Sequence, residues 1–489
     1  FVISKFITGG YHFLKKMEKS RREVMGGGKT NTGEPEKNNI TQGSIFGQLL
    51  LFFFPILFGT FFQQLYNTAD AVVVGHFVGK QALAAVGGTT STLINLLVGF
   101  FVGLSSGATV VISQYYGARK PDKVHWAVHT AVAFSLMGGV LFMVIGIVFA
   151  HMALSAMHTP EDVLNYAVVY IRIYFLGMIP NLIYNMGAGI LRAVGDSKRP
   201  LYFLIGSCMV NILLDIILVA GLRMGVAGAA IATITSQLFS ACMVVYALIH
   251  TDDMYKLVWS KVRIDERMLR RIVRIGIPAG MQSVMYNISN IIIQAGVNTL
   301  GTDNVTAWAT YGKVDGLYWM MINALGISVT TFVGQNYGAG RIDRVRKGAG
   351  ACMVIGTIMT AIVSTLLYLK GYLLIDLFTS DAQVQEIGLS LIHFMVPTLI
   401  TYITIEILSG TLRGVGDAWM PLIMTGVGVC CLRVIWIIFF LPQYRSILAA
   451  AFCYPMSWTI TSVAFVVYYF FFSSLRRVDG MKWFRKKDH

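Results

Sequence analysis

Four carboxylates lie inside long apolar stretches of the chain, where a charged side chain needs a specific reason to be kept. A charge at the centre of a bilayer costs roughly 2.5–3.5 kcal/mol on insertion scales. Acids in such positions bind and release protons, coordinate cations, or pair with a nearby base. The four are Asp70, Asp215, Asp315 and Glu406. Their chemistry is therefore proton or cation handling, or charge balance inside the membrane.

Asp70 and Asp215 are placed to act together. If the chain starts on the inner side, each acid lies about five or six residues from the outer end of its segment, so the two carboxylates have similar depth. Asn211 precedes Asp215 by four residues, which puts its amide on the same helix face. The carboxylates could share a proton or hold a Na⁺ ion together with Asn211. The alternative is that each carboxylate only bonds a neighbouring helix.

The second half of the chain carries a different set of charges. Lys313 and Asp315 lie in the eighth apolar segment, Glu406 in the tenth and Arg433 in the eleventh. The two bases could neutralise the two acids, which would make the group a structural ion-pair network. A second functional site, lining a cavity in this half, is the other interpretation.

Composition and segment length identify the elements that hold these charges. The chain has 489 residues, 55% hydrophobic and 13% charged, with a mean hydropathy of +0.65. Soluble domains carry about 25% charged residues, and a membrane helix needs about 20 apolar residues. The expected fold is all-α and integral to the membrane, with twelve transmembrane helices. They lie at 46–75, 82–112, 124–150, 162–191, 201–221, 226–250, 275–299, 305–333, 348–372, 384–411, 421–441 and 448–474.

The chain repeats itself at a spacing of 221 residues. The sequence QYYGA at 114–118 recurs as QNYGA at 335–339, and LRAVGD at 191–196 recurs as LRGVGD at 412–417. Two blocks in the same order at one spacing indicate a duplicated lobe, because solenoid repeats are far shorter. We expect two pseudo-symmetric lobes of six helices, with a substrate site between them.

Polarity divides the chain into five parts. A charged linker, expected to form an amphipathic helix on the inner surface, joins the lobes, and polar tails flank them. Because the chain begins at Phe1, Met17 and Met25 are candidate start residues. The parts are a disordered cytoplasmic tail at 1–44, an N-lobe at 45–250, a cytoplasmic linker at 251–274, a C-lobe at 275–475 and a basic cytoplasmic tail at 476–489.

The positive charge is distributed as in a membrane protein. The chain has 39 lysine and arginine residues against 24 acids, a net charge of +15. Of the 39, 32 fall in tails and loops on one side of the twelve segments and four on the other. The positive-inside rule then predicts a multi-pass protein of the plasma (cytoplasmic) membrane with both termini in the cytoplasm. The basic surface faces anionic lipid headgroups, which argues against a nucleic-acid partner.

The six cysteines all fall in the apolar segments and have no metal-type spacing. Their expected role is that of small buried hydrophobic residues. No metal or cofactor is therefore expected beyond a coupling ion, either H⁺ or Na⁺.

Pro55 and Pro278 are repeat partners, each in the first helix of its lobe. Proline removes a backbone hydrogen bond and permits a kink in a helix. Bending at these two positions is a candidate gating device, although harmless kinks are common in membrane helices.

Together these features resemble the multidrug and toxic compound extrusion (MATE) transporters over nearly the whole of 45–475. The resemblance rests on twelve segments in two lobes and on the two repeated loops. It implies a V-shaped pair of bundles around a central cavity. It also implies secondary active antiport, in which small organic cations leave in exchange for H⁺ or Na⁺. We expect a monomer whose other partners are membrane lipids.

The candidate coupling residues are most similar to those of the DinF-like branch, which uses an aspartate in helix 1 and an Asn-x-x-x-Asp pair in helix 5. Asp70, Asn211 and Asp215 match these positions, and Thr233 looks like the threonine that accompanies them. The NorM-like branch instead has an acid in helix 7. Residues 275–299 contain none, although Glu406 could stand in for that branch's helix 10 acid.

Three other functions are less well supported by the sequence. A lipid-linked oligosaccharide flippase of the same superfamily would often have additional helices or several cations in its cavity, and the first lobe shows no cationic cluster. An intramembrane enzyme needs a substrate-cleaving constellation, and no GxGD motif surrounds Asp70 or Asp215. A channel would need a filter-like motif, which neither lobe has.

Overall fold

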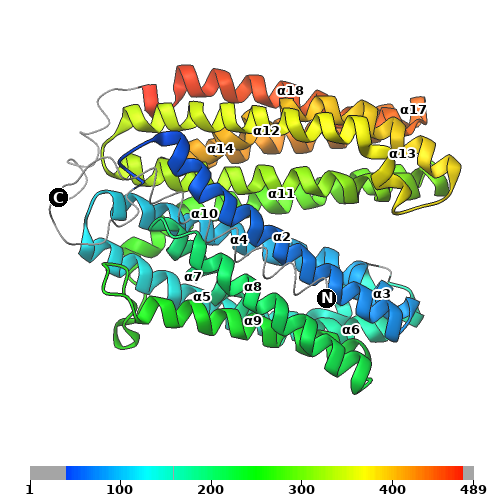
Figure 1. Cartoon of the computed structure of the whole chain (residues 1–489), viewed down its shortest axis with the longest axis horizontal. Coiled ribbons are helices and arrows are strands. Elements are labelled where there is room, and N and C mark those ends of the chain that lie inside the picture. Colours follow the sequence, from blue (N-terminus) through cyan, green and yellow to red (C-terminus); the bar gives the residue numbers. More distant parts are fainter. Residues whose placement is uncertain (1–39, 158, 477–489) are drawn as a thin grey trace, which may run out of the picture. The chain divides into compact units, whose positions relative to one another are not determined.

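The computed structural model describes residues 40–157 and 159–476, and these form helices with no strand among them (Figure 1). Ten helices in this part of the chain are long and apolar enough to cross a membrane, and a pair bent by 51° adds an eleventh. The twelfth expected span, 275–299, lies in a long helix whose first turns are charged. The prediction of an all-α membrane protein is confirmed.

The six expected spans of the N-lobe are all present as helices, three of them in two pieces. Gly177 marks the bend of the broken span. In chain order the spans are α2 (Ile45–Phe77), α3 (Lys80–Gly87) with α4 (Thr89–Gly117), α5 (Pro121–Ala156), α6 (Glu161–Leu176) with α7 (Met178–Ala193), α8 (Lys198–Asp215) with the π-helical Ile216–Gly221, and α9 (Gly225–Ile249).

The C-lobe follows the same order with more irregular helices. A 3₁₀ segment, Val396–Thr401, joins the two pieces of its fourth span. The spans are α10 (Glu266–Asn298), α11 (Thr302–Gly338), α12 (Ile342–Asp376), α13 (Ala382–Met395) with α14 (Ile403–Gly414), α15 (Trp419–Thr425) continuing through α16 (Leu432–Ile435) to α17 (Leu441–Tyr444), and α18 (Ile447–Val467).

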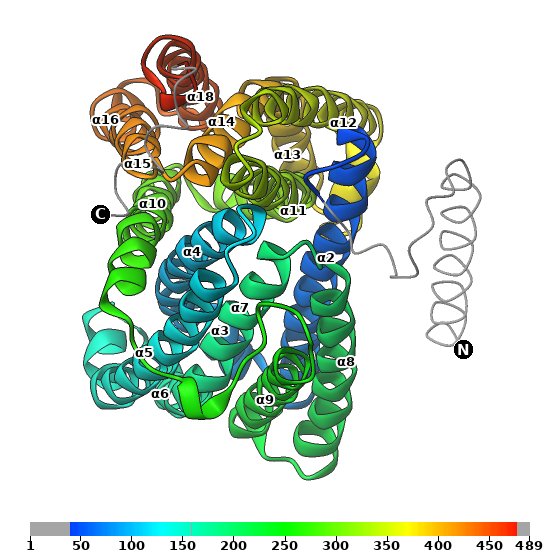
Figure 2. The same ribbon diagram turned by 90° about the vertical axis from the view of Figure 1, so that its left-hand side faces the viewer.

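The first helix of each lobe begins in the core of the other lobe. The start of α2, with Phe52 and Phe53, is buried among side chains of α11, α12 and α14. The start of α10, with Ile272 and Ile275, is buried among side chains of α4, α5 and α7. Figure 2 shows α2 leaving the side of α12 and reaching α8. The two lobes are thus interlocked at the end where these helices start.

Hydrogen bonds fix the residues before α2 to the C-lobe. Arg341 donates to the carbonyl oxygen of Thr41 at 2.7 Å, and Arg344 donates to that of Gly43 at 2.9 Å. Residues 40–44 were expected to belong to a disordered tail, but they are held in place by these contacts. The rest of that tail, and the expected C-terminal tail from 477 onwards, lie outside the described residues.

The linker between the lobes differs from the expected amphipathic helix. Residues 250–265 are irregular apart from the single 3₁₀ turn Trp259–Lys261. The arginines from Arg267 to Arg274 instead lie in the first turns of α10, whereas Lys261 and Arg263 precede it. Asp265 caps α10 by accepting a hydrogen bond from the backbone N–H of Met268. From these first turns α10 continues without a break into the expected membrane span.

Glycines bring α4 and α10 into backbone contact. A Cβ at Gly103 would lie 2.5 Å from the Cα of Gly280, and a Cβ at Gly107 would lie 2.6 Å from the backbone nitrogen of Gly276. Each helix carries its pair of glycines four residues apart, as in the GxxxG interfaces of membrane helices. The sequence shows this spacing in both segments, but only the structure shows that the two segments touch.

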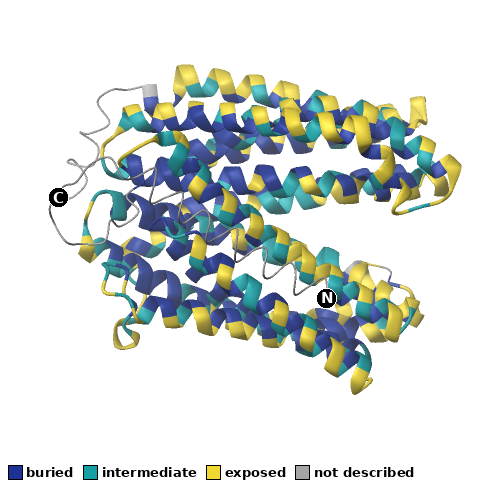
Figure 3. Ribbon diagram, viewed as in Figure 1, coloured by how far each residue is buried: buried dark blue, intermediate teal, exposed yellow. Residues whose placement is uncertain are grey.

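Exposed residues lie along the outer faces of the helices (Figure 3), and many of them are large and apolar. Val148 of α5, Leu369 of α12 and Phe470 after α18 are each more than 60% exposed. Exposed apolar surface of this extent is typical of helices that face lipid chains.

The charge distribution predicts the orientation in the membrane, and cysteine labelling tests this prediction. We expect an impermeant thiol reagent applied to intact cells to label Thr302→Cys but not Asp343→Cys. Thr302 begins α11 and Asp343 lies just beyond its other end; both are exposed, and neither has the left-handed backbone of the nearby Gly301 and Gly340. The parent protein is the control, because its cysteines lie within spans. The reverse labelling pattern would contradict the inner placement of both termini.

Candidate functional site

Asp70, Asn211, Asp215 and Thr233 meet inside the N-lobe, as the sequence predicted. Asp70 of α2 interacts with Asn211 and Asp215 of α8 and with Thr233 of α9. The Thr233 hydroxyl donates to Asp70 Oδ2 at 3.0 Å. All four side chains are at most 4% exposed. Three helices that are distant in sequence therefore converge on one pair of carboxylates.

These carboxylates have few other partners. Among the described residues, Asp70 Oδ1, both carboxylate oxygens of Asp215, and the Asn211 side chain make no hydrogen bond. No arginine, lysine or histidine is among the described groups that act on either acid. Two adjacent buried carboxylates cannot both stay charged without a compensating cation. The geometry suits one shared proton or one small monovalent cation.

A cavity of about 720 Å³ borders this cluster. It is lined mainly by α2, α4, α6, α7 and α8, with one or two residues each from α3, α9 and α11. Asp70 and Thr233 reach its wall, and the stacked rings of Tyr170 and Tyr174 form another part of it. Its volume lies within the range of pockets that hold drug-sized ligands. Lining of mixed apolar and polar character suits an amphiphilic molecule.

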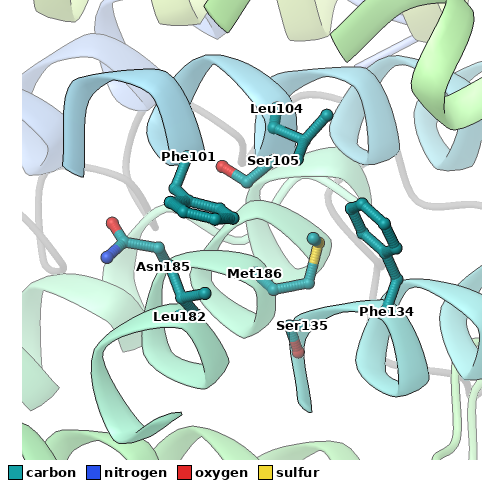
Figure 4. Close-up of a pocket in the computed structure, with 8 residues that line it drawn as sticks. All are labelled: Phe101, Leu104, Ser105, Phe134, Ser135, Leu182, Asn185 and Met186. Atoms are coloured by element: carbon teal, nitrogen blue, oxygen red, sulfur yellow. The ribbon is translucent and has the colours of Figure 1, made fainter. Parts of the chain in front are cut away.

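A second pocket in the described part of the chain is far smaller. It has a volume of about 10 Å³ and lies between α4, α5 and α7 (Figure 4). That is room for about one water molecule. Asn185 borders both this pocket and the large cavity, so the two are neighbours.

The charges of the C-lobe do not form the single network that one interpretation expected. Asp315 accepts a hydrogen bond from Trp319 Nε1 at 2.5 Å and lies within electrostatic range of Arg433. Arg433 is only 2% exposed, donates from Nε to Ser457 at 3.0 Å, and stacks 4.0 Å from the ring centre of Tyr454. The two groups act on each other electrostatically but share no hydrogen bond, and Asp315 is only partly buried, so the expected ion pair stays a prediction.

Glu406 and Lys313 lie elsewhere. Glu406 accepts a hydrogen bond from the Tyr402 hydroxyl at 3.3 Å, and its nearby base is Arg413. Lys313 is exposed and lines the large cavity instead of neutralising an acid. The sequence could not separate these cases, because helix rotation decides which side chains face each other.

Pro55 and Pro278 lie in α2 and α10 without breaking either helix. Pro55 lines the cavity. Each proline lies close to the point where its helix leaves the core of the opposite lobe, next to Ile56 and Ile275 respectively. Their role in gating stays a prediction.

The pair of Asp315 and Arg433 is expected to stabilise the fold. Asp315→Asn removes an acid that acts on the buried Arg433 without a direct bond, so we expect a loss below the roughly 3–5 kcal/mol for breaking a buried pair in contact. We expect a lower yield of folded protein and a lower melting temperature in detergent. The double variant Asp315→Asn/Arg433→Met should recover most of the loss, because it removes both charges. A single variant that melts like the parent but loses its ion dependence would instead make Asp315 a coupling residue.

The repeated loops contact each other across the lobes. Gln114 Nε2 donates to the Gly414 carbonyl at 2.9 Å, and its repeat partner Gln335 donates to the Ala193 carbonyl at 2.7 Å. Each bond joins one copy of the QxYGA sequence to the other lobe's copy of LRxVGD. We call this symmetrical pair of hydrogen bonds the inter-lobe latch. The sequence showed the repeat but gave no reason for it.

Comparison with known proteins agrees with this architecture. The MatE family model matches residues 55–217 and 278–439. The probable multidrug resistance protein YoeA of Bacillus subtilis is 28% identical over 437 residues, which cover 88% of this chain and 94% of YoeA. The multidrug export protein MepA of Staphylococcus haemolyticus is 21% identical, over 77% of this chain and 83% of MepA.

Solved structures show the same fold. An outward-facing multidrug resistance MATE family transporter superimposes with a TM-score of 0.84 at 21% identity, covering 92% of this chain and all of that one. A transporter of the MOP superfamily from Pyrococcus furiosus gives a TM-score of 0.83 at 20% identity, with the same coverage. The comparisons thus extend over both lobes.

Proposed function

The chain belongs to the MatE family, and on this premise we propose that it is a secondary active transporter that exports amphiphilic organic compounds with a cationic group. Export is driven by exchange for H⁺ or Na⁺ through alternating access. The relatives named as multidrug export proteins support this function. Membership of a transporter family removes the intramembrane enzyme from the alternatives.

The large cavity beside Asp70 is the observation that carries the proposal. It has the volume for a drug-sized molecule, an aromatic wall at Tyr170 and Tyr174, and the carboxylate of Asp70 at its surface. Aromatic faces and a carboxylate both attract organic cations. The same carboxylate faces Asp215 inside the lobe. Substrate and coupling ion can therefore compete for one negative charge, which is the requirement for exchange.

Competition works in both directions around this charge. When a proton or Na⁺ occupies the carboxylate pair, the cavity loses its attraction for a cationic group, and the substrate leaves. When the ion leaves, the charge returns and a new substrate binds. An ion can shift the balance of states only by its differential affinity for them. Asp70 lies on α2, whose start is buried in the C-lobe, so a change at Asp70 can reach both lobes.

Alternating access also requires the cavity to be closed toward one side of the membrane, and the inter-lobe latch would supply this closure. With the start of α2 inside the cell, the latch lies at the inner end, and the described conformation is closed there. Exchange of the latch for contacts at the outer end would open the cavity to the cytoplasm. The inner position of both termini, the plasma-membrane location and the monomeric state belong to this proposal.

A lipid-linked oligosaccharide flippase is the second candidate, because two bases line the cavity. Arg192 and Lys313 are both in its wall, whereas the sequence had suggested that the first lobe offers no such cations. An anionic lipid headgroup is one ligand that would suit them. The amphiphile exporter remains the better supported function, because Asp70 and the aromatic wall suit a cationic group.

Transport in proteoliposomes tests the proposal. Purified protein is reconstituted, and uptake of ethidium is followed with a proton gradient alone, a sodium gradient alone and neither. We expect uptake with one gradient and none without it. Uptake that follows the dye gradient alone would contradict antiport, and flipping of a fluorescent lipid without dye uptake would favour the flippase.

A further inference from the structure

Arg192 is a half-buried cation that makes no ion pair with an acid in the described part of the chain. It lies in the last turn of α7 and lines the large cavity. Its Nε is buried without a hydrogen bond, and the group that acts on its charge is the phenol of Tyr184. A cation that faces a cavity without an acid beside it is available to bind an anionic group there.

The equivalent arginine of the C-lobe is balanced. Arg413 follows Arg192 at the repeat spacing of 221 residues. It lies near the Glu406 carboxylate and donates to the Ser409 hydroxyl at 3.3 Å. The same spacing leads from Glu406 back to Asn185 in the N-lobe. The acid that would balance Arg192 is thus replaced by an amide.

A second difference accompanies the first. A Cβ at Gly326 would lie 1.9 Å from Glu406 Oε1, so a glycine makes room for the acid in the C-lobe. The N-lobe equivalent of Gly326 is Ser105, and Figure 4 shows Ser105 and Asn185 at the same small pocket. The glycine and acid of one lobe correspond to the serine and amide of the other. The N-lobe arginine is therefore left free to face the cavity.

The lining around Arg192 is polar and uncharged. Asn181, Asn185 and Ser197 all belong to it. The Asn185 Nδ2 donates to the backbone oxygen of Asn181 at 2.9 Å, which fixes this amide beside the arginine. Over the whole cavity the charged lining residues are Arg192, Lys313 and Asp70. Two bases face one acid, an unusual balance for a site that takes only cations.

We propose that Arg192, with the neighbouring amide side chains, forms a subsite for an anionic group on the transported molecule. The group is a carboxylate or a phosphate, because a guanidinium binds both with two parallel hydrogen bonds. The preferred substrates are then zwitterionic amphiphiles, whose cationic group lies toward Asp70. A molecule with a cationic group alone, such as ethidium, would leave Arg192 unpaired and would bind more weakly than a zwitterion. This inference rests on the proposed transport function and names the class of its substrates.

Two dyes that differ by one charge test the proposal. Rhodamine B carries a free carboxylate and a cationic ring system, and its ethyl ester carries the cation alone. Binding to purified protein in nanodiscs of phosphatidylcholine is measured by fluorescence anisotropy. We expect the parent protein to bind rhodamine B at least about tenfold more tightly than the ester, as one charge-assisted pair predicts. Equal affinities, or no measurable binding of rhodamine B, would overturn the proposal.

Matched variants in the two lobes separate recognition from stability. Arg192→Gln should bind rhodamine B and the ester alike and should melt no lower than the parent, because Arg192 makes no ion pair that the change would break. Arg413→Gln should keep the preference for rhodamine B but melt at a lower temperature, because it leaves Glu406 unpaired. A preference that survives Arg192→Gln, or that disappears in Arg413→Gln instead, would contradict the assignment.

A variant that introduces the missing acid into the N-lobe gives an independent test of the subsite. Asn185→Glu/Ser105→Gly transfers the glycine and acid of the C-lobe to the N-lobe. The new carboxylate should neutralise Arg192 and reverse the preference, so that the ester binds more tightly than rhodamine B. An unchanged preference for rhodamine B in this folded variant would count against the subsite.

Transport and lipid composition distinguish the remaining cases. Failure to transport either dye, with the Arg192-dependent binding preference intact, would contradict the proposed exporter and leave the subsite supported. Transport of both dyes without any binding preference would support the proposed exporter and contradict the subsite. Repeating the binding in nanodiscs with phosphatidylglycerol tests the source of the anion. Displacement of rhodamine B by this lipid in the parent, but no lipid effect in Arg192→Gln, assigns the subsite to a lipid phosphate.

Discussion

Asp70→Asn and Asp215→Asn are each expected to abolish gradient-driven efflux while leaving the protein folded. Asparagine has the shape of a protonated aspartate, so each variant imitates the neutral state permanently. The two side chains at positions 70 and 215 then hold at most one negative charge. The exchange of ion for substrate needs both acids and therefore stops. We expect efflux of ethidium from cells to fall to the level of cells without the protein, a loss of at least about tenfold.

The measurement compares variants at matched amounts in the membrane. Asp303→Asn is the control, because Asp303 is exposed in the first turn of α11 and takes no part in the cluster. Thr233→Ala removes the hydroxyl that donates to Asp70 and should weaken efflux less than either aspartate variant. Efflux at the parent rate from both Asp70→Asn and Asp215→Asn would refute a coupling site in the N-lobe.

The N-lobe cluster could be predicted because its members obey helix geometry. Asn211 and Asp215 share a face at a spacing of four residues, and an acid in the membrane almost always faces the interior of a bundle. Depth counted from the segment ends then placed Asp70 beside them. Helix geometry could not locate Thr233 on α9, which was assigned only because the chain resembles the DinF-like branch at that position.

The C-lobe shows where such reasoning stops. Sequence placed Lys313 two residues before Asp315, but residues two apart do not share a helix face. The structure puts Lys313 in the cavity and Asp315 beside Arg433. The base that accompanies Glu406 is Arg413, which the sequence marks only as part of a repeated loop. Which charges pair depends on helix rotation and tilt, and those follow from packing across the whole lobe.

The repeated loops were recognised as a duplication, but their contact required the structure. Gln114 and Gln335 each donate to a carbonyl oxygen in the opposite lobe, and not within their own repeat. Sequence alone cannot tell whether a repeated residue was merely retained after the duplication or has a role that needs both copies. The two hydrogen bonds are symmetrical, since each lobe contributes one donor and one acceptor. This symmetry indicates that the inter-lobe latch needs both copies of the repeat.

Gly117→Ala and Gly338→Ala are expected to prevent closure of the inner end. A Cβ at Gly117 would lie 2.0 Å from the Gln335 carbonyl oxygen, and one at Gly338 would lie 1.9 Å from that of Gln114. Both contacts are with backbone of the opposite lobe, so a change of rotamer cannot relieve them. A clash in a packed interface costs about 1–3 kcal/mol or more, which shifts a two-state balance by roughly tenfold to a hundredfold.

The shift can be read directly as a distance between the lobes. Spin labels at Asp122 and Asp343, repeat partners that are exposed at the starts of α5 and α12, report the separation by electron-electron resonance. We expect the parent to show mainly the short distance and either alanine variant mainly a longer one, with efflux reduced. Gly350→Ala is the control, because no atom lies within 4 Å of its Cβ. The clash exists only in the closed arrangement, so an unchanged distance in a folded Gly338→Ala protein would mean that the latch is not what holds the inner end shut.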